Sequence, residues 1–327
     1  MASDTRTAGQ QSGEDRPRRA SPRDYLGLLR PAQWVKNVVV FAGPAAGMRL
    51  FSPKPFVNAV LAFAAFCLAA SATYAINDIV DRKADASHPT KRKRAVARGA
   101  IKPAGALIVA VVLIIAAGVL TTLLPGEVAV VLACYLILTL AYSFTLKRRM
   151  ILDVIIIATG FVLRAWAGSL AVEVVTSKWL VACMFTLCMF MGFAKRRSEI
   201  AMIGSFEEAG QHRPTLIRYT PELLTHLITV SAGIAIMTFL LYTMDHSLGS
   251  SPFHKEQLFY TLPIVVYGIF RFAMLSELGV YSGPTEIVLR DKAMAAAILI
   301  WAALALLIVY QDSLFRPGGI AGLFNAM

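Results

Sequence analysis

Nine apolar stretches follow one another along the chain and constrain its fold more than any other feature. They cover residues 35–51, 56–76, 103–124, 128–145, 151–172, 179–194, 223–243, 258–276 and 293–314. Most approach the roughly 20 apolar residues that a helix needs to cross a bilayer. The mean hydropathy of +0.62 and a charged fraction of only 16% also set the chain apart from soluble domains. The sequence predicts an all-α membrane protein with about nine transmembrane helices, of which the first is interrupted by "FAGPAAG".

The distribution of Lys and Arg predicts how these helices are oriented. Cations crowd the N-terminal tail and the even-numbered connections, and cytosolic loops collect such residues. Only Arg49, Lys54, Lys178, Lys255 and Arg316 fall on the other side. We therefore expect a multi-pass protein of the cell (plasma) membrane with a cytosolic N-terminus. Topology explains the net charge of +12, so no nucleic acid partner is needed.

The polar residues 1–24 contain Pro and scattered charge but no apolar run that could act as a signal peptide. We expect a disordered cytosolic tail there, followed by one transmembrane domain over residues 25–327. The cysteines lie inside apolar runs without the spacing of a zinc site or a disulfide framework. We interpret them as small packing residues.

The stretch "NDIVDRKAD" (77–85) places carboxylates at the cytosolic end of the second apolar segment. At a helical repeat, Tyr74, Asp78, Asp81 and Asp85 fall on one face, with Asn77 at its edge. Like charges at such spacing repel one another, and the C-terminal end of a helix disfavours anions. A cation relieves both effects, and hard oxygen ligands suit Mg²⁺, with Mn²⁺ equally compatible by ligand type. The alternative is a solvated polar helix end.

The basic run "KRKR" (91–94) follows directly. Arg92 and Lys93 are best explained as topology signals. Lys91 and Arg94 remain candidates for substrate binding.

Other polar side chains are expected at the same membrane face. Asp153 and Arg164 share a helix face with Gly160 between them, and an Arg inside an apolar segment is a candidate functional residue, the alternative being a structural pair with a neighbouring helix. Arg271 is closer to a structural contact. Lys195 and Glu199 lie one turn apart, which is compatible with local helix support or with phosphate binding. The remaining candidates for substrate binding are Lys36, Tyr142, Lys147 and Arg196.

These motifs resemble the UbiA-type membrane prenyltransferase superfamily. The resemblance is carried by "NDIVDRKAD" with "HPTK" (88–91), "YSFTLKR" (142–148) and "LDV" (152–154), and it extends from "RPAQWVKN" (30–37) to "LRDKAM" (289–294). It implies helices around a lipid-open cavity with an active site at the cytosolic mouth. It also implies Mg²⁺ held by Asn77, Asp78, Asp81 and Asp85, with the three aspartates as catalytic residues.

One departure from the family pattern indicates a branch. Where aromatic prenyltransferases carry a second pair of Asp residues, this chain reads "KRRSE" (195–199). This resembles the branch that transfers phosphoribose from phosphoribosyl diphosphate to a polyprenyl phosphate and releases diphosphate, a step toward a lipid-linked arabinose donor for cell-wall polysaccharide. Two anionic substrates require more cations and fewer carboxylates. Tyr74, on the face of the Asp motif, could touch either phosphate.

Two other functions stay open. An aromatic prenyltransferase of quinone or haem biosynthesis would share the first Asp motif, although the second Asp pair is missing. A non-enzymatic transporter would also have several spans and buried arginines, although no inverted repeat is visible. The sequence leaves the oligomeric state open, a homo-oligomer included.

Overall fold

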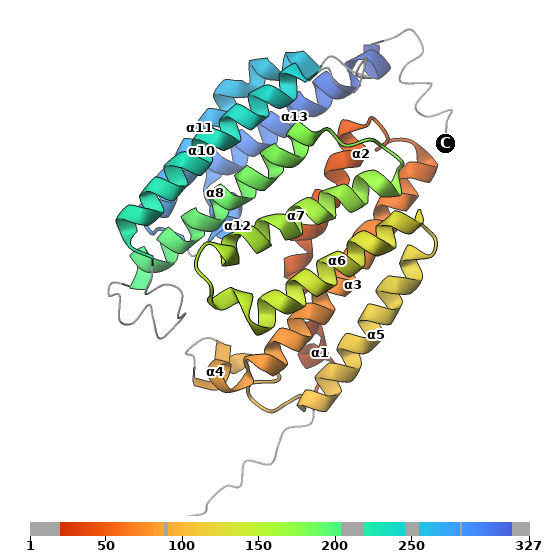
Figure 1. The fold of residues 1–327 in the computed structure, drawn as a ribbon, viewed down its shortest axis with the longest axis vertical. Coiled ribbons are helices and arrows are strands. Elements are labelled where there is room, and N and C mark those ends of the chain that lie inside the picture. Colours follow the sequence, from red (N-terminus) through yellow and green to blue (C-terminus); the bar gives the residue numbers. More distant parts are fainter. Residues whose placement is uncertain (1–19, 88–90, 204–218, 246–254, 282, 316–327) are drawn as a thin grey trace, which may run out of the picture.

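The computed structural model describes residues 20–87, 91–203, 219–245, 255–281 and 283–315, all of them helical or in connections (Figure 1). The long helices are α3 (Pro53–Val80), α5 (Pro103–Thr121), α6 (Gly126–Phe144), α7 (Leu152–Ala171), α8 (Lys178–Ile203), α10 (Pro221–Met244), α11 (Leu262–Glu277) and α13 (Lys292–Phe315). The short ones are α1 (Pro22–Leu29), η1 (Pro31–Phe41), α2 (Ala42–Ala46), α4 (Arg82–Ser87), η2 (Lys91–Lys93), η3 (Leu146–Arg148), η5 (Lys255–Thr261) and α12 (Pro284–Arg290). Most residues of the expected tail lie outside the described ranges, but α1 already begins at Pro22.

Eight segments of the described chain are long and apolar enough to cross a membrane, and together they make this an all-α membrane protein. They match the second to ninth apolar stretches, with η5 and α11 forming one continuous span from Lys255 to Glu277. Proline occupies the first turn of α3, α5 and α10, where its fixed φ angle and missing N–H are tolerated. The apolar stretches of the sequence therefore located these spans correctly.

The first apolar stretch does not form a long α-helix, so eight of the nine expected segments are long helices in the described part of the chain. Its residues form the 11-residue 3₁₀ helix η1 and the five-residue α-helix α2, which contains Gly43 and Pro44. The backbone of η1 lies directly against α7. A Cβ atom added at Gly168 would stand 1.7 Å from the carbonyl oxygen of Val40, so this close approach requires glycine.

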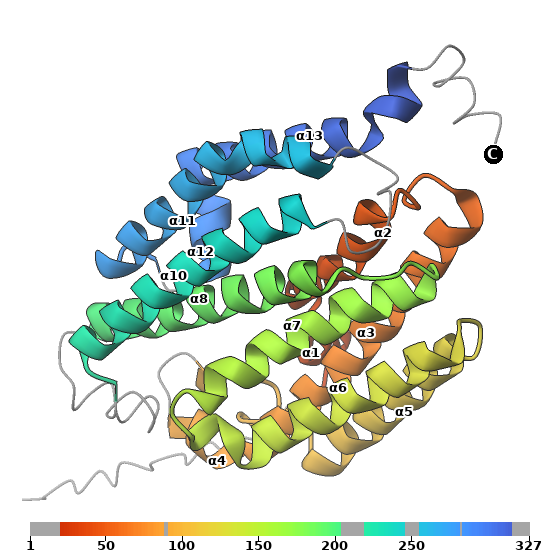
Figure 2. The same cartoon turned by 45° about the horizontal axis from the view of Figure 1, so that its top comes forward.

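The long helices form two groups that meet at α7 and α8 (Figure 2). In one group α3 packs against α5 and α6, and Phe66, Leu132 and Tyr135 belong to its buried core. In the other group α8, α10 and α11 surround a core that contains Phe190, Phe193 and Phe272. The segment η1 contacts both α3 and α7, and thus lies along the first group.

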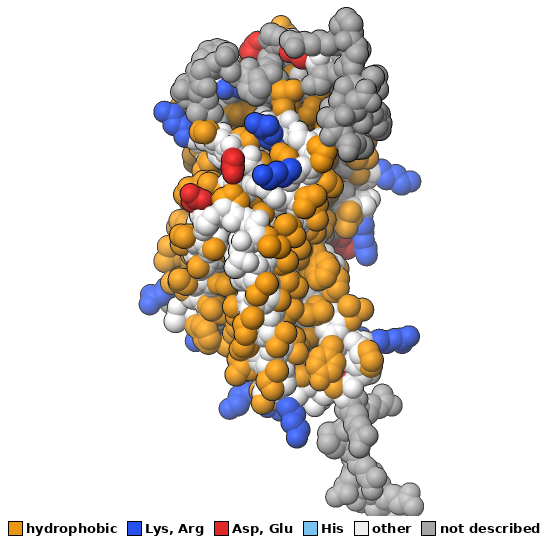
Figure 3. Space-filling view, turned by 90° about the vertical axis from the view of Figure 1, so that its right-hand side faces the viewer, with side chains coloured by type: hydrophobic (Ala, Val, Ile, Leu, Met, Phe, Trp, Pro, Cys, Tyr) orange, Lys and Arg blue, Asp and Glu red, His pale blue; other side chains and the backbone are white. Residues whose placement is uncertain are grey.

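Hydrophobic side chains cover much of the outer surface of the bundle, as Figure 3 shows for one face. Ile108, Ile137 and Leu299 are all more than 60% exposed. Such extensive apolar exposure on long helices fits lipid contact better than water contact.

Candidate active site

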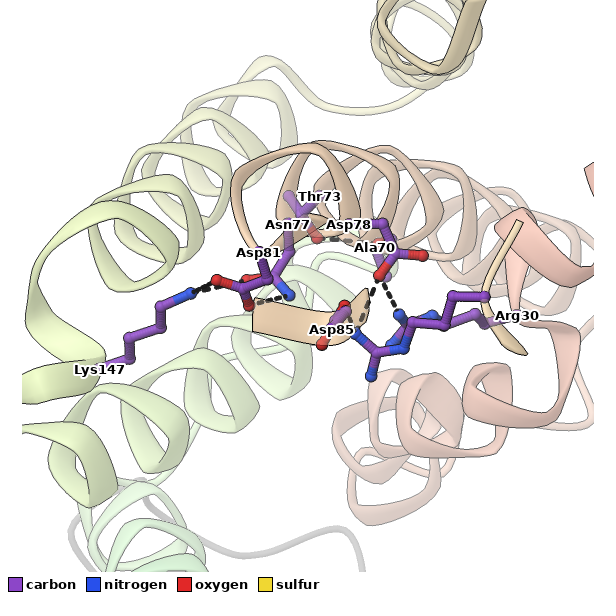
Figure 4. Close-up of polar contacts among 9 residues, drawn as sticks. Arg30, Ala70, Thr73, Asn77, Asp78, Asp81, Asp85 and Lys147 are labelled. Atoms are coloured by element: carbon purple, nitrogen blue, oxygen red, sulfur yellow. Dashed lines mark hydrogen bonds and ion pairs between the residues drawn. The ribbon is translucent and has the colours of Figure 1, made fainter. Parts of the chain in front are cut away.

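The Asp motif lies at the end of α3, where the helix is interrupted. The helix ends at Val80, Asp81 has φ −87° and ψ 1°, and α4 starts at Arg82. Figure 4 shows the consequence, because Asp78 and Asp81 point to opposite sides of α3. The predicted single face of carboxylates is therefore wrong in its geometry.

Asp78 and Asp85 share arginine partners on one side of the motif. Arg30 donates to Asp78 Oδ1, while Arg94 Nη1 lies 3.2 Å from Asp78 Oδ1 and 2.6 Å from Asp85 Oδ2. Both aspartates are 3% exposed. Buried carboxylates require such compensation, so these ion pairs hold α1, α4 and the η2 region to the end of α3.

Asp81 lies on the other side with Asn77 and Lys147. The Asn77 amide donates to Asp81 Oδ2 at 3.0 Å, and Lys147 pairs with Asp81 Oδ1 and lies 3.4 Å from Asn77 Oδ1. One carboxylate and one amide oxygen thus face the same ammonium group. This oxygen pair is a small cradle for a cation.

The donor chemistry of this cradle fits Mg²⁺. Within the described residues, no three His, Cys, Asp or Glu side chains converge in a way that could hold a metal ion by themselves. Mg²⁺ usually binds through one or two carboxylates together with substrate phosphates rather than in an all-protein cage. Asn77 and Asp81 supply hard oxygen ligands of this kind, and phosphate oxygens would complete the set.

A basic pocket of about 400 Å³ opens beside Asp78. Its cations come from α1 and from the segment after the Asp motif, and they are Arg23, Arg30, Lys91, Lys93 and Arg94. The guanidinium of Arg30 also lies 4.9 Å from the centre of the Tyr74 ring. Burial lowers the pKa of Arg30 while Asp78 opposes the shift, and an arginine stays charged in either case.

A second pocket, of about 520 Å³, lies between η1, α7, α8 and α12. It combines Lys36, Lys195, Arg196 and Arg290 with a wall of apolar side chains, which are Ile157, Phe161, Met191 and Leu289. A pocket with cations on one side and apolar atoms on the other can hold the phosphate of a lipid together with the first part of its chain.

Arg196, which lines the second pocket, is held by two ion pairs. Its Nε lies 3.0 Å from Asp153 Oδ2 and its Nη1 lies 2.7 Å from Glu199 Oε2, and the side chain is 1% exposed. Asp153 also accepts a hydrogen bond from Tyr219 at 3.1 Å. Lys195 lies 3.6 Å from Glu199, as the one-turn spacing predicted.

Arg164 lies deep in α7, and its hydrogen bonds reach neighbouring helices as well as its own. Its guanidinium donates to Asn37 Oδ1 at 2.7 Å, to the Tyr135 hydroxyl at 2.8 Å and to the carbonyl of Gly160 at 2.8 Å. No carboxylate among the described residues forms an ion pair with it. The guanidinium of Arg164 instead lies over the rings of Tyr135 and Phe161.

The pKa of Lys36 shows that several cations of the site act on one another. Burial, reinforced by repulsion from Lys195, Arg164 and Arg30, lowers the pKa of Lys36 to about 8. These cations lie on η1, α7, α8 and the end of α1, so both basic pockets belong to one positive region. Such a region attracts phosphate groups.

The remaining candidates divide into site and non-site residues. Lys91 lines the first pocket, and Tyr142 interacts electrostatically with Arg196. Arg271 forms a two-pronged ion pair with Asp291 at 2.6 and 2.8 Å, which is a structural contact. His88, Pro89 and Thr90 of the "HPTK" motif lie outside the described residues.

The sequence analysis did not identify four residues of the site, which are Arg30, Asn37, Tyr135 and Arg290. Arg30 and Arg290 looked like topology signals because they lie in basic connections. Asn37 belongs to "RPAQWVKN", where its polar amide inside an apolar stretch was the available signal. Tyr135 gave no signal, because an aromatic residue in an apolar helix is common.

Comparison with known proteins agrees with this architecture. The sequence model of the UbiA prenyltransferase family matches residues 38–278. Decaprenyl-phosphate phosphoribosyltransferase from Corynebacterium glutamicum is 33% identical over 92% of this chain and 92% of its own length, and the Mycolicibacterium smegmatis enzyme of that name is 32% identical over 90% and 96%. The structure of a UbiA homolog from Archaeoglobus fulgidus bound to GPP and Mg²⁺ superposes with a TM-score of 0.66 at 17% identity, over 88% of this chain and 98% of that one. The chain belongs to the UbiA prenyltransferase family.

Proposed function

We propose that this chain transfers the 5-phosphoribosyl group of phosphoribosyl diphosphate to a polyprenyl phosphate such as decaprenyl phosphate. Diphosphate is the second product, and the lipid product serves as a step toward an arabinose donor for cell-wall polysaccharide. Relatives with this activity in their names cover nearly the whole chain, which supports the proposal.

The second pocket is the observation that carries the proposal. Lys195 and Arg196 stand where the aromatic enzymes of the superfamily carry acidic residues, and Lys36 and Arg290 line the same space. A second metal-bound diphosphate would require carboxylates at this position. Cations beside apolar side chains instead favour a lipid monophosphate.

The two basic pockets would divide the substrates between them. Arg30 and Arg94, held by Asp78 and Asp85, face the pocket beside the Asp motif and would bind phosphoribosyl diphosphate. Lys36 and Lys195 would bind the phosphate of the lipid, whose chain would extend along Phe161 and Met191. Arg164 would add positive charge near the lipid phosphate, because it is close enough to Lys36 to lower the pKa of Lys36 by repulsion.

The reaction needs no proton acceptor from the protein. A phosphate oxygen of the lipid forms a bond to C1 of the ribose while the bond from C1 to the diphosphate oxygen breaks. The diphosphate leaves with the bonding electron pair, and the sugar passes through an oxocarbenium-like state. A phosphate monoester is already anionic near neutral pH, so the nucleophile requires no general base.

The residues of the Asp motif would have two roles. Asn77 and Asp81 would hold Mg²⁺, which neutralises the charge that develops on the departing diphosphate. Lys147 pairs with Asp81 in this structure. When a metal ion binds the Asp81 carboxylate, Lys147 would contact a phosphate instead. Asp78 and Asp85 would orient Arg30 and Arg94, and Tyr74 would position Arg30 through its ring face.

Arg196 would position its neighbours. Its ion pairs with Asp153 and Glu199 leave its guanidinium 1% exposed. Through Glu199 it holds the helix turn that carries Lys195, and Tyr142 lies within electrostatic range. The concentration of Lys and Arg at this end further supports a plasma-membrane protein whose site faces the cytosol.

A turnover assay with the purified full chain tests the proposal. With Mg²⁺, labelled phosphoribosyl diphosphate and polyprenyl phosphate, we expect labelled lipid and diphosphate in equal amounts. Transfer of a prenyl group from a polyprenyl diphosphate to an aromatic acid, without use of the sugar donor, would instead favour an aromatic prenyltransferase. Absence of turnover with either substrate pair, in protein that binds them, would favour a carrier.

A further inference from the structure

A third pocket, of about 480 Å³, lies at the opposite end of the bundle from the Asp motif. It is enclosed by α2, the segment after α7, the end of α10 and the start of η5. Figures 1 and 2 both place α2 beside the end of α10, away from α4. Ser169 of α7 lines this pocket and lies 16 residues after Asp153, a distance of about 24 Å along the helix. It is therefore no part of the proposed active site.

Lys255 is the unusual residue of this pocket. Its side chain is 4% exposed, and its ammonium lies 5.9 Å from the centre of the Tyr242 ring. Within the described part of the chain, no carboxylate forms an ion pair with Lys255. A buried ammonium without an ion-pair partner is costly, and the Tyr242 ring together with the nearby charge of Asp245 compensates only part of that cost. The pocket thus has an electrostatic need for an anion.

Thr176 provides a second unsatisfied group in the same pocket. Its hydroxyl oxygen is buried and has no hydrogen-bond partner among the residues that the structure describes. Ser177 also lines the pocket, but its hydroxyl donates to Asp245 at 2.8 Å. The Thr176 hydroxyl can therefore donate to a ligand oxygen, and exposed Arg49 adds positive charge to the lining.

We propose that this third pocket binds a phosphate group. A tetrahedral oxyanion accepts from both an ammonium and a hydroxyl, which satisfies Lys255 and Thr176 together. Exposed apolar side chains lie close to the lining residues in sequence, with Val175 75% exposed and Met244 58% exposed. They place the pocket at the level where phospholipid headgroups meet a membrane protein, on the membrane side opposite the Asp motif. The phosphate comes from such a headgroup or from free phosphate.

Binding measurements with the full chain in a phosphate-free maltoside detergent test this site independently of the proposed enzyme activity. One arm measures retention of phosphatidylglycerol by native mass spectrometry, and the other measures the rise in unfolding temperature with inorganic phosphate. Lys255→Met should weaken binding about tenfold, because it removes a charge-assisted hydrogen bond. Thr176→Val has nearly the same shape and should weaken it about threefold.

Lys178→Met is the matched control, because Lys178 is exposed on α8 near the same end of the bundle and does not line the pocket. Phosphatidylglycerol loss in Lys255→Met but not in Lys178→Met supports the site with a lipid as its source. The same pattern with inorganic phosphate alone supports the site with free phosphate as its source. Equal binding by Lys255→Met and wild type in both arms overturns the proposal. If Lys255→Met does not fold, unchanged binding by Thr176→Val overturns it.

Discussion

Arg196 Nε donates a hydrogen bond of 3.0 Å to Asp153 Oδ2, joining the C-terminal half of α8 to the first turn of α7. Both side chains are buried, at 1% and 0% exposure. The two long-helix groups meet at α7 and α8, so this ion pair connects them beside the second pocket. Breaking a buried ion pair costs more than its formation contributes, because the remaining charge stays buried.

Asp153→Ala should therefore lower the free energy of unfolding by about 3 kcal/mol. The variant leaves Arg196 with Glu199 alone and also removes the acceptor of the Tyr219 hydroxyl. Chemical or thermal unfolding in detergent measures the loss. Glu127→Ala, at an exposed position in the first turn of α6, should change stability by less than about 0.5 kcal/mol. Equal stability of the Asp153 variant and wild type would contradict the structural role of this pair.

Asp81→Asn tests the metal cradle. The side chain is 28% exposed at a polar mouth, so the variant should fold normally, while turnover should fall roughly a hundredfold because phosphate-bound Mg²⁺ loses its carboxylate ligand. Turnover is measured at saturating Mg²⁺ together with the unfolding temperature. Asp312→Asn, near the far end of α13, is the control and should keep full activity. Unchanged turnover in Asp81→Asn would end the metal proposal.

The sequence predicted the long spans because about 20 apolar residues have few alternatives in a membrane. It missed the form of 35–51, which is the 3₁₀ helix η1 and the short helix α2 packed against α7 instead of one long α-helix. That outcome depends on the close approach of Val40 to Gly168, which is a tertiary contact and leaves no local pattern.

The candidate site was predictable in its residue types but not in its pairing. Helical periodicity placed Asp78, Asp81 and Asp85 on one face, yet the interruption at Asp81 divides them between Arg94 and Lys147. Similarly, the shared face of Asp153 and Arg164 was expected, but each found a partner on another helix. A helical repeat describes neighbours within one element, whereas ion pairs between elements depend on how the helices pack.

Lys195→Asp tests the second pocket. The reversal removes a cation and introduces repulsion against phosphate, so KM for the lipid phosphate should rise at least tenfold. Lys292→Asp makes the same charge change at an exposed position of α13 that lines none of the three pockets, and it should leave KM nearly unchanged. If both variants lose affinity equally, a general surface charge and not the second pocket attracts the lipid.

Orientation in the membrane can be tested with single cysteines in a variant whose four native cysteines are replaced. Arg92→Cys in η2 and Lys178→Cys at the start of α8 occupy exposed positions at the two ends of the bundle. An impermeant thiol reagent should label position 178 in intact cells and position 92 only after permeabilisation. Labelling of position 92 from outside would place the Asp motif on the wrong side for a cytosolic sugar donor.

The last prediction concerns pH and the lowered pKa of Lys36, about 8. A phosphate favours the charged lysine, so bound ligand raises the pKa of Lys36 and affinity should fall as pH rises above about 8, by up to tenfold per pH unit. The ligand does not change charge in this range, because the second pKa of a phosphate monoester is about 6. The sign is opposite for stability without ligand: the unfolded lysine binds its proton more tightly, so the free energy of unfolding rises between about pH 8 and 10. Lys36→Met should bind lipid phosphate more weakly at pH 7 and lose both pH dependences, whereas an identical fall in affinity in Lys36→Met and wild type would assign the titration to another group.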